Sequence, residues 1–223
     1  MNEIFFLSHV GIVSVFLFFC LRLGKGALIA LMILSSVLAN LFIVKQITLF
    51  SFQVTASDVF AVSTIWGMNL LQEFYGKKEA TKATYISFLM LLFFTLMAKL
   101  HLMYLPNHFD LSQDAFRKIL SQTPRIVISS FIVFFIVQRI DIQIFSWLSK
   151  KIKNKLSLRV ALSLSCSQFI DTVLFTFLAL FGVVGSVWQV IFISYMIKMS
   201  VIVASLAITP LLKPKKVSSY EAV

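Results

Sequence analysis

The feature that most constrains this chain is a succession of seven apolar runs separated by short charged segments. A membrane-spanning helix needs about 20 mostly apolar residues, because the hydrocarbon core of a bilayer is about 30 Å thick and a helix rises about 1.5 Å per residue. Only 13% of the chain is charged, against about 25% in soluble domains. The runs are residues 4–21, 27–44, 54–74, 84–104, 126–146, 158–181 and 187–210.

These runs predict an all-α, polytopic membrane protein in which residues 1–212 form a single transmembrane bundle. The first run is short and is the weakest of the seven, so we expect a six-helix core with an extra N-terminal span, and residues 213–223 form a cytoplasmic tail. The longest connection, residues 106–124, is expected to carry a short helix, capped by Asp110 or Ser112, that lies on the membrane surface. A lid over an external entrance is the alternative interpretation of that segment.

The basic residues orient the bundle. Thirteen lie in loops on one predicted side and four in loops on the other. Short loops on the cytoplasmic side of a membrane protein are enriched in Lys and Arg. The N-terminus is therefore expected outside and the C-terminal tail in the cytoplasm. The thirteen are Arg22, Lys25, Lys77, Lys78, Lys82, Lys150, Lys151, Lys153, Lys155, Arg159, Lys213, Lys215 and Lys216; the four are Lys45, Arg117, Lys118 and Arg125.

The charge distribution, the cysteines and the motifs of the chain argue against several classes of function. The formal charge of +11 sits in these short loops, which is typical of a topology signal and not of direct nucleic-acid binding. Cys20 and Cys166 both fall inside apolar runs, so neither a disulfide framework nor a metal site is expected. The chain has none of the nucleophile, phosphate-binding or zinc motifs of soluble enzymes. We therefore expect a protein that is not an enzyme and that uses no cofactor.

Two charged residues lie near the middle of predicted spans: Asp171 in the sixth and Lys198 in the seventh. A charge at that depth costs about 2.5 to 3.5 kcal/mol on insertion scales, so it is expected to have a partner and a function. We predict that Lys198 pairs with Asp171, either as a structural ion pair or as part of a binding or coupling site. Gln168, Thr172 and Phe175 share the helical face of Asp171, and Tyr195 shares that of Lys198.

Other polar residues inside the spans are candidates either for helix packing or for coupling. Arg125 begins the fifth span, and Gln138 and Asp141 lie near its inner end. Glu73 and Asn69 lie in the third span and Asn40 in the second. We predict that Asn40 and Asn69 contact a ligand, and we assign Glu73, Arg125, Gln138, Asp141 and Thr172 to packing or coupling.

Six parts of the chain are the most specific: Asn40, 69–78 (NLLQEFYGKK), 124–130 (PRIVISS), 138–145 (QRIDIQIF), 167–175 (SQFIDTVLF) and 195–198 (YMIK). Together these segments resemble the queuosine precursor transporter family, which is also called the vitamin uptake transporter family. The resemblance extends from the second to the seventh span, about three quarters of the chain. One departure is that the family usually has Asp at the position of Asn69, which puts proton coupling at that position in doubt.

The resemblance implies a multi-pass inner-membrane importer of 7-deazaguanine bases: 7-cyano-7-deazaguanine, its aminomethyl form or queuine. A carboxylate such as Asp171 can accept two N–H bonds from such a base, and an amide such as Gln168 can bond its carbonyl. Phe175 and Tyr195 are the candidate stacking partners. Lys198 would hold Asp171 in place or contact the base carbonyl.

Two other functions stay open at this point. The first is a substrate-binding subunit of an energy-coupling-factor importer, which would need a scaffold and ATPase partners. The second is a membrane assembly protein whose polar residues only pack helices. The expected partners are the small-molecule base and the lipid bilayer, and a homodimer is left open.

Overall fold

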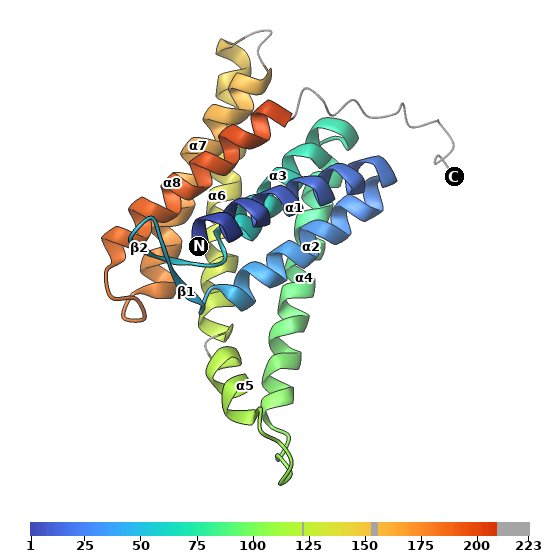
Figure 1. Ribbon diagram of the computed structural model, residues 1–223. Helices are drawn as coiled ribbons and strands as arrows, with labels where there is room; N and C mark the ends of the chain where they lie inside the picture. Colours follow the sequence, from blue (N-terminus) through green and yellow to red (C-terminus); the bar gives the residue numbers. More distant parts are fainter. Residues whose placement is uncertain (122, 153–155, 209–223) are drawn as a thin grey trace, which may run out of the picture.

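The computed structural model describes residues 1–121, 123–152 and 156–208. Within these described ranges, seven long helices overlap the seven predicted runs (Figure 1). The predicted tail, residues 213–223, lies outside the described residues. The long helices are α1 (Asn2–Leu23), α2 (Lys25–Phe42), α3 (Asp58–Tyr75), α4 (Lys77–Leu102), α6 (Thr123–Lys151), α7 (Leu156–Phe175) and α8 (Val187–Ile208).

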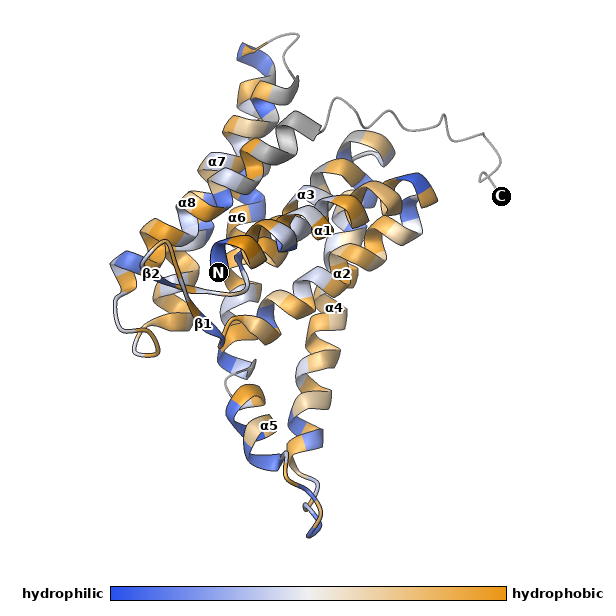
Figure 2. Cartoon of the chain, viewed as in Figure 1, coloured by the Kyte–Doolittle hydropathy of each residue, from blue (hydrophilic) through white to orange (hydrophobic). Residues whose placement is uncertain are grey.

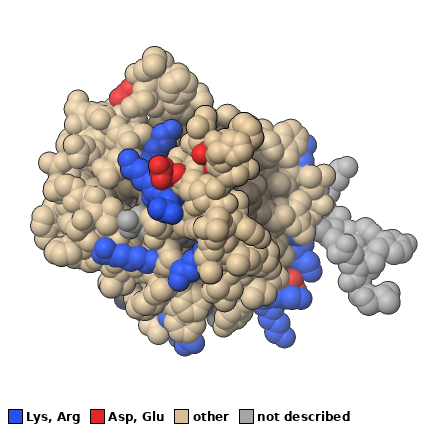
Figure 3. All heavy atoms as spheres, turned by 90° about the horizontal axis from the view of Figure 1, so that it is seen from below, with Lys and Arg blue, Asp and Glu red and all other residues tan. Residues whose placement is uncertain are grey.

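Apolar side chains cover the outside of the helices, as a bilayer requires. Figure 2 shows hydrophobic residues along the lengths of the helices and hydrophilic residues mainly at their ends and in α5 (Gln113–Leu120). Figure 3, which views the molecule from below Figure 1, shows a mostly uncharged face with the charged side chains in a few small groups. Among the described residues, five helical segments are long and apolar enough to cross a membrane by length and composition: Asn2–Leu23, Lys25–Phe42, Lys78–Leu102, Gln113–Phe145 and Ala161–Leu180.

The helices pack as two groups. The first group is α1 to α4, in which α2 packs most extensively on α3; its core includes Leu17, Leu28, Met32 and Leu71. The second is α6 to α8, in which α6 packs most extensively on α7. Contacts of α3 with α8, α4 with α6 and α2 with α6 join the groups. The surface between them therefore includes residues of α2, α3, α4, α6 and α8.

Two glycines have structural roles in the first group, one in close helix packing and one in a tight turn. Gly67 lies on α3, where a Cβ atom would come within 2.6 Å of Met32 Cγ on α2, so only glycine lets the two helices approach this closely. Gly76 joins α3 to α4 as a single residue with φ of +89°. That conformation is accessible mainly to glycine.

A β-hairpin between α2 and α3 corrects the prediction that the third span begins at residue 54. Strands β1 (Gln46–Leu49) and β2 (Phe52–Thr55) pair antiparallel, and α3 begins only at Asp58. Buried Leu49 and Val54 pack on Ile193 and Ile197 of α8. The alternation of polar and apolar residues over 46–55 is a strand pattern that the apolar run concealed. Phe50 and Ser51 form the turn with positive φ, as two-residue hairpin turns require.

The short helix predicted within residues 106–124 is present as α5. Ser112 occupies its N-cap position without forming a side-chain cap bond. Instead, the backbone N–H and the hydroxyl of Ser112 each donate to the Asp110 carboxylate at 2.7 Å, and these bonds lower the pKa of Asp110. Phe109 and Phe116 are exposed, whereas Leu120 is buried. This amphipathic placement supports the membrane-surface interpretation.

Candidate functional site

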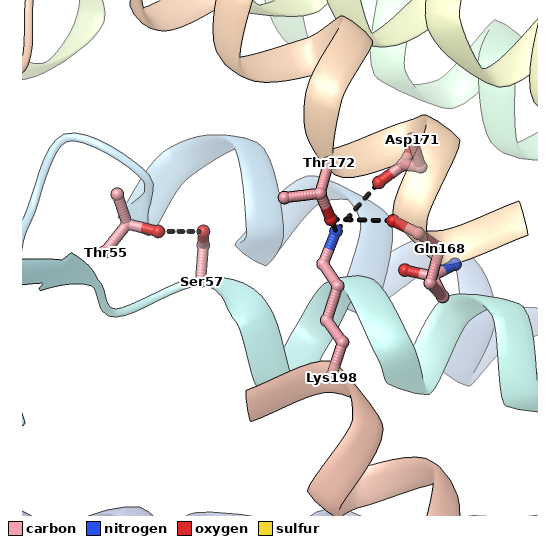
Figure 4. Close-up of polar contacts among 6 residues, drawn as sticks. All are labelled: Thr55, Ser57, Gln168, Asp171, Thr172 and Lys198. Carbon is pink, nitrogen blue, oxygen red and sulfur yellow. Dashed lines mark hydrogen bonds and ion pairs between the residues drawn. The ribbon is translucent and has the colours of Figure 1, made fainter. Parts of the chain in front are cut away.

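The two deep charges meet between α7 and α8 (Figure 4). Lys198 Nζ lies 2.8 Å from Asp171 Oδ2 and 3.1 Å from Thr172 Oγ1. The Lys198 side chain is 5% exposed and that of Asp171 is 22% exposed. An ammonium so deeply buried needs a close partner to offset its lost hydration. The same side chain thus joins α8 to two consecutive residues of α7.

The α7 backbone changes conformation just beyond this pair. The helix continues as a π-helical segment, η1 (Thr176–Leu180), in which Thr176, Ala179 and Leu180 are buried. Such π segments often occur at functional sites because they realign the side chains that follow. Arg125 of α6 closes the end of this segment, since its guanidinium donates to the carbonyl oxygens of Leu178 at 3.3 Å and Phe181 at 2.8 Å.

A cavity of about 120 Å³ lies between the two helix groups and reaches the ion pair. Three predicted ligand contacts besides Lys198 line it: Asn40, Asp171 and Phe175. Asn40 is held from both sides, because its Nδ2 donates to the Ser36 carbonyl at 2.8 Å and its Oδ1 accepts from Ser130 Oγ at 2.8 Å. The complete lining is Ser36, Ala39, Asn40, Ile43, Ser57, Asp58, Ala61, Thr64, Ile65, Ser130, Phe134, Asp171, Phe175 and Lys198.

Asp58 is a cavity residue that sequence reasoning missed. It is the first residue of α3 and is 8% exposed. Its carboxylate is close enough to interact with the Ser194 hydroxyl and with the charges of Lys198 and Asp171. Its Oδ2 atom has no hydrogen-bond partner among the described residues. The available signal was a carboxylate within an apolar run, but acids in the first turn of a helix are common for dipole reasons alone.

Two predicted contacts lie away from the cavity lining. Gln168 is 1% exposed, and neither atom of its side-chain amide has a hydrogen-bond partner within the described part of the chain. A buried amide left unpaired costs about 1 to 3 kcal/mol, so it is available to a polar partner. Tyr195 packs edge-on against Phe169, with ring centroids 5.3 Å apart. Phe134, which was not predicted, provides a second aromatic ring to the cavity.

The remaining polar candidates connect helices. Asp141 Oδ1 accepts from Ser163 Oγ at 2.6 Å and from Ser167 Oγ at 2.7 Å, which joins α6 to α7. Gln138 Nε2 donates to Thr84 Oγ1 at 3.4 Å, which joins α6 to α4. Asn69 and Glu73 lie on α3, but their side chains are outside the described part of the structure.

The site has the composition of a small-molecule binding site in a multi-pass membrane protein: an ion pair, an amide and aromatic rings around a cavity at membrane-helix interfaces. In the described residues, no group of three or more His, Cys, Asp or Glu side chains is placed to hold a metal ion.

Comparison with known proteins agrees with a multi-pass membrane protein that binds a small molecule, and it identifies the family. Residues 55–212 match the family described as "Putative vitamin uptake transporter", and the chain belongs to that family. It is similar to a protein of Bacillus subtilis (strain 168) named "Probable queuosine precursor transporter", with 33% identity over 205 residues that cover 90% of this chain and 89% of the relative. No solved structure matches the chain significantly.

Proposed function

We propose that this protein imports queuosine precursors, 7-deazaguanine bases such as 7-cyano-7-deazaguanine, its aminomethyl form or queuine, across the inner membrane for transfer-RNA modification. The observation that carries the proposal is the cavity between the helix groups, with Asp171, Lys198, Asn40 and two phenylalanine rings on its wall. Its volume of about 120 Å³ is well below the roughly 300 to 1,000 Å³ of drug-sized ligand sites. A ligand of the size of a single base is therefore favoured over a nucleoside.

In this proposal, Asp171 accepts the N–H donors on the pairing edge of the base. Lys198 holds its Oδ2 atom, and among the described residues no hydrogen bond to Oδ1 is formed. A carboxylate can accept bonds at both oxygens, so Oδ1 remains for the ligand while the ion pair fixes the orientation of the group. Lys198 is therefore a positioning residue in this proposal.

Asn40 and the aromatic rings would complete recognition. Asn40 already uses its Oδ1 and one Nδ2 hydrogen, which leaves one N–H to donate to the carbonyl of the base. Phe134 and Phe175 line the cavity from α6 and α7 and are the candidates to stack on the base. Stacking on an aromatic side chain contributes about 1 to 3 kcal/mol per base in single-strand binders. Gln168 lies outside the lining and would join only after a rearrangement.

The decisive experiment measures queuosine in the transfer RNA of a bacterial host that lacks both queuosine synthesis and its own importer. Expression of this protein with 7-cyano-7-deazaguanine in the medium should restore queuosine. Asp171→Asn keeps the shape of the side chain but replaces one acceptor with a donor, so half-maximal restoration should require at least about tenfold more precursor, as expected for a loss of about 1.4 kcal/mol.

The matched control is Asp114→Asn, an identical change on the exposed surface of α5, which should behave as wild type. Restoration by Asp171→Asn at wild-type precursor concentrations would remove the carboxylate from the recognition scheme. Uptake by the purified protein in liposomes without any ATPase would exclude the energy-coupling-factor alternative. Well-expressed protein that restores queuosine with none of the three precursors would contradict the proposed function.

A further inference from the structure

A second cavity, of about 280 Å³, lies beside the first at the end of the bundle that carries the hairpin. It is enclosed by α1, the hairpin and the start of α3, and its polar lining includes His9, Lys45 and Thr55. Asp58 lines this cavity and also the candidate substrate cavity. The carboxylate of Asp58 therefore stands at the boundary between the two spaces.

A pair of hydroxyl groups crosses the same boundary. Thr55 lines the hairpin cavity and Ser57 lines the substrate cavity, and their Oγ atoms lie 3.1 Å apart (Figure 4). Both residues are buried. Ser57 directly precedes Asp58 in the sequence, and Thr55 lies three positions before it. Hydroxyl groups both donate and accept, so this pair provides a polar connection next to the carboxylate.

The charges around Asp58 do not balance. The charged groups that face it are Asp171 and Lys198 from α7 and α8, with Lys45 and the titratable His9 on the wall of the hairpin cavity. Inside the substrate cavity, two carboxylates share the single ammonium of Lys198. An uncompensated buried charge costs several kcal/mol, and a proton on one carboxylate restores neutrality.

The geometry indicates which carboxylate takes the proton. Asp171 is bonded to Lys198 at 2.8 Å and is the more exposed of the two acids. Asp58 is more than nine-tenths buried, and its Oδ2 atom is unpartnered among the described residues. Of the two carboxylates, only that of Asp58 also borders the hairpin cavity.

We propose that Asp58 is the proton-binding site that couples substrate uptake to a proton gradient, an inference that rests on the function proposed above. A proton entering from the hairpin cavity forms an O–H bond on Asp58 and leaves Lys198 to Asp171, which is the arrangement that presents Asp171 to the base. Loss of that proton creates a second anion that competes for Lys198. Proton binding and substrate binding therefore strengthen one another, and by linkage each does so equally.

The test uses purified protein in liposomes and labelled 7-cyano-7-deazaguanine as the probe. With one proton per substrate, a gradient of one pH unit, acid outside, can drive about tenfold accumulation. Wild type should show this accumulation. Asp58→Asn should lose it while still exchanging labelled for unlabelled probe across the membrane, and the matched surface variant Asp114→Asn should retain it.

The outcomes separate this inference from the proposed function. If wild type does not transport the probe at all, the proposed function fails. If wild type exchanges the probe but ignores the pH gradient, or accumulates it only with a sodium gradient, the proton site is overturned. Retained pH-driven accumulation in Asp58→Asn would overturn it as well.

A binding measurement on the wild type removes the dependence on a well-folded variant. In weakly buffered detergent solution, addition of the probe should take up protons from the medium, to a maximum of one per protein, and the affinity should fall with rising pH by no more than tenfold per unit. Binding without proton uptake, and with an affinity that does not change with pH, would contradict the inference even if Asp58→Asn failed to fold.

Discussion

Lys198 is the residue on which the stability of the cavity should depend most. It is the only cation among the described cavity-lining residues, where it faces Asp58 and Asp171. Lys198→Met retains the length of the side chain but leaves both acids without a counterion. Removing one partner of a buried ion pair typically costs about 3 to 5 kcal/mol, so a marked fall in thermal stability in detergent is expected.

A double variant separates stability from recognition. In Asp171→Asn combined with Lys198→Met, one carboxylate and the ammonium are removed together, so much of the lost stability should return while precursor uptake stays impaired. Lys118→Met, on the exposed surface of α5, serves as the matched control and should melt as wild type does. A Lys198→Met variant as stable as wild type would indicate that Lys198 does not serve as the counterion of Asp58 and Asp171.

At the scale of the helices, the close contact between α2 and α3 depends on Gly67, which has no side chain. A Cβ atom on Gly67 would meet Met32 Cγ at 2.6 Å, and forcing an extra methyl into a packed core costs about 1 to 3 kcal/mol. Gly67→Ala should therefore lower the melting temperature. Met32→Ala removes the side chain in the way, so the double variant should lose less stability than the sum of the two single variants.

This prediction has a control in the same kind of helix. Gly11 lies on α1 and a Cβ atom there would meet nothing within 4 Å. Gly11→Ala should be neutral or slightly stabilising, because alanine is favoured over glycine inside helices by about 1 kcal/mol. If Gly67→Ala were equally neutral, α2 and α3 could separate without cost, and the close approach would have no energetic importance.

The helices and the ion pair were predictable from the sequence because each rests on a local constraint. A bilayer fixes the length of every apolar run independently of the others, and two isolated charges in such runs must find partners. The hairpin was not predicted, because the end of its alternating pattern, residues 54 and 55, was assigned to the apolar run 54–74. Tyr195 shares the helical face of Lys198, yet α8 is packed so that Tyr195 contacts Phe169 and only Lys198 lines the cavity.

Asp58 illustrates a different limit of sequence reasoning. Its spacing from Asp171 and Lys198 carries no periodicity, since the three residues lie on three different helices. Only the packing of α3 against α8 brings the first turn of α3 to the ion pair. In a single sequence, the only sign of such a tertiary contact is a charged residue within an apolar run.

For the whole molecule, the position of the cavity suggests which contacts a transport cycle must change. The Lys198–Asp171 pair lies within the second helix group, whereas the Ser130–Asn40 hydrogen bond joins α6 to α2 and so crosses between the groups. Transporters commonly move one helix group against another around a fixed binding site. The Ser130–Asn40 bond would then break and reform during the cycle, while the ion pair would move as a unit with the second group.

The orientation of this molecule in the membrane gives the last prediction. The loops of one predicted side carry thirteen basic residues against four on the other. This difference predicts that the N-terminus, the hairpin and α5 lie outside the cell and that the turn between α3 and α4 lies in the cytoplasm. The hairpin cavity would then open toward the side from which both precursor and protons arrive. That arrangement is required for Asp58 to receive a proton from outside.

Single cysteines test this orientation in intact cells, after the native thiols are removed by Cys20→Ser and Cys166→Ser. Ser51→Cys in the hairpin turn and Asn107→Cys beside α5 are both at exposed positions and should react with a membrane-impermeant maleimide added outside. Lys78→Cys, exposed at the start of α4, should react only after permeabilisation. Labelling of Lys78→Cys in intact cells together with protection of Ser51→Cys would invert the topology. Asp58 would then face the cytoplasm, where it could not capture a proton from the external side.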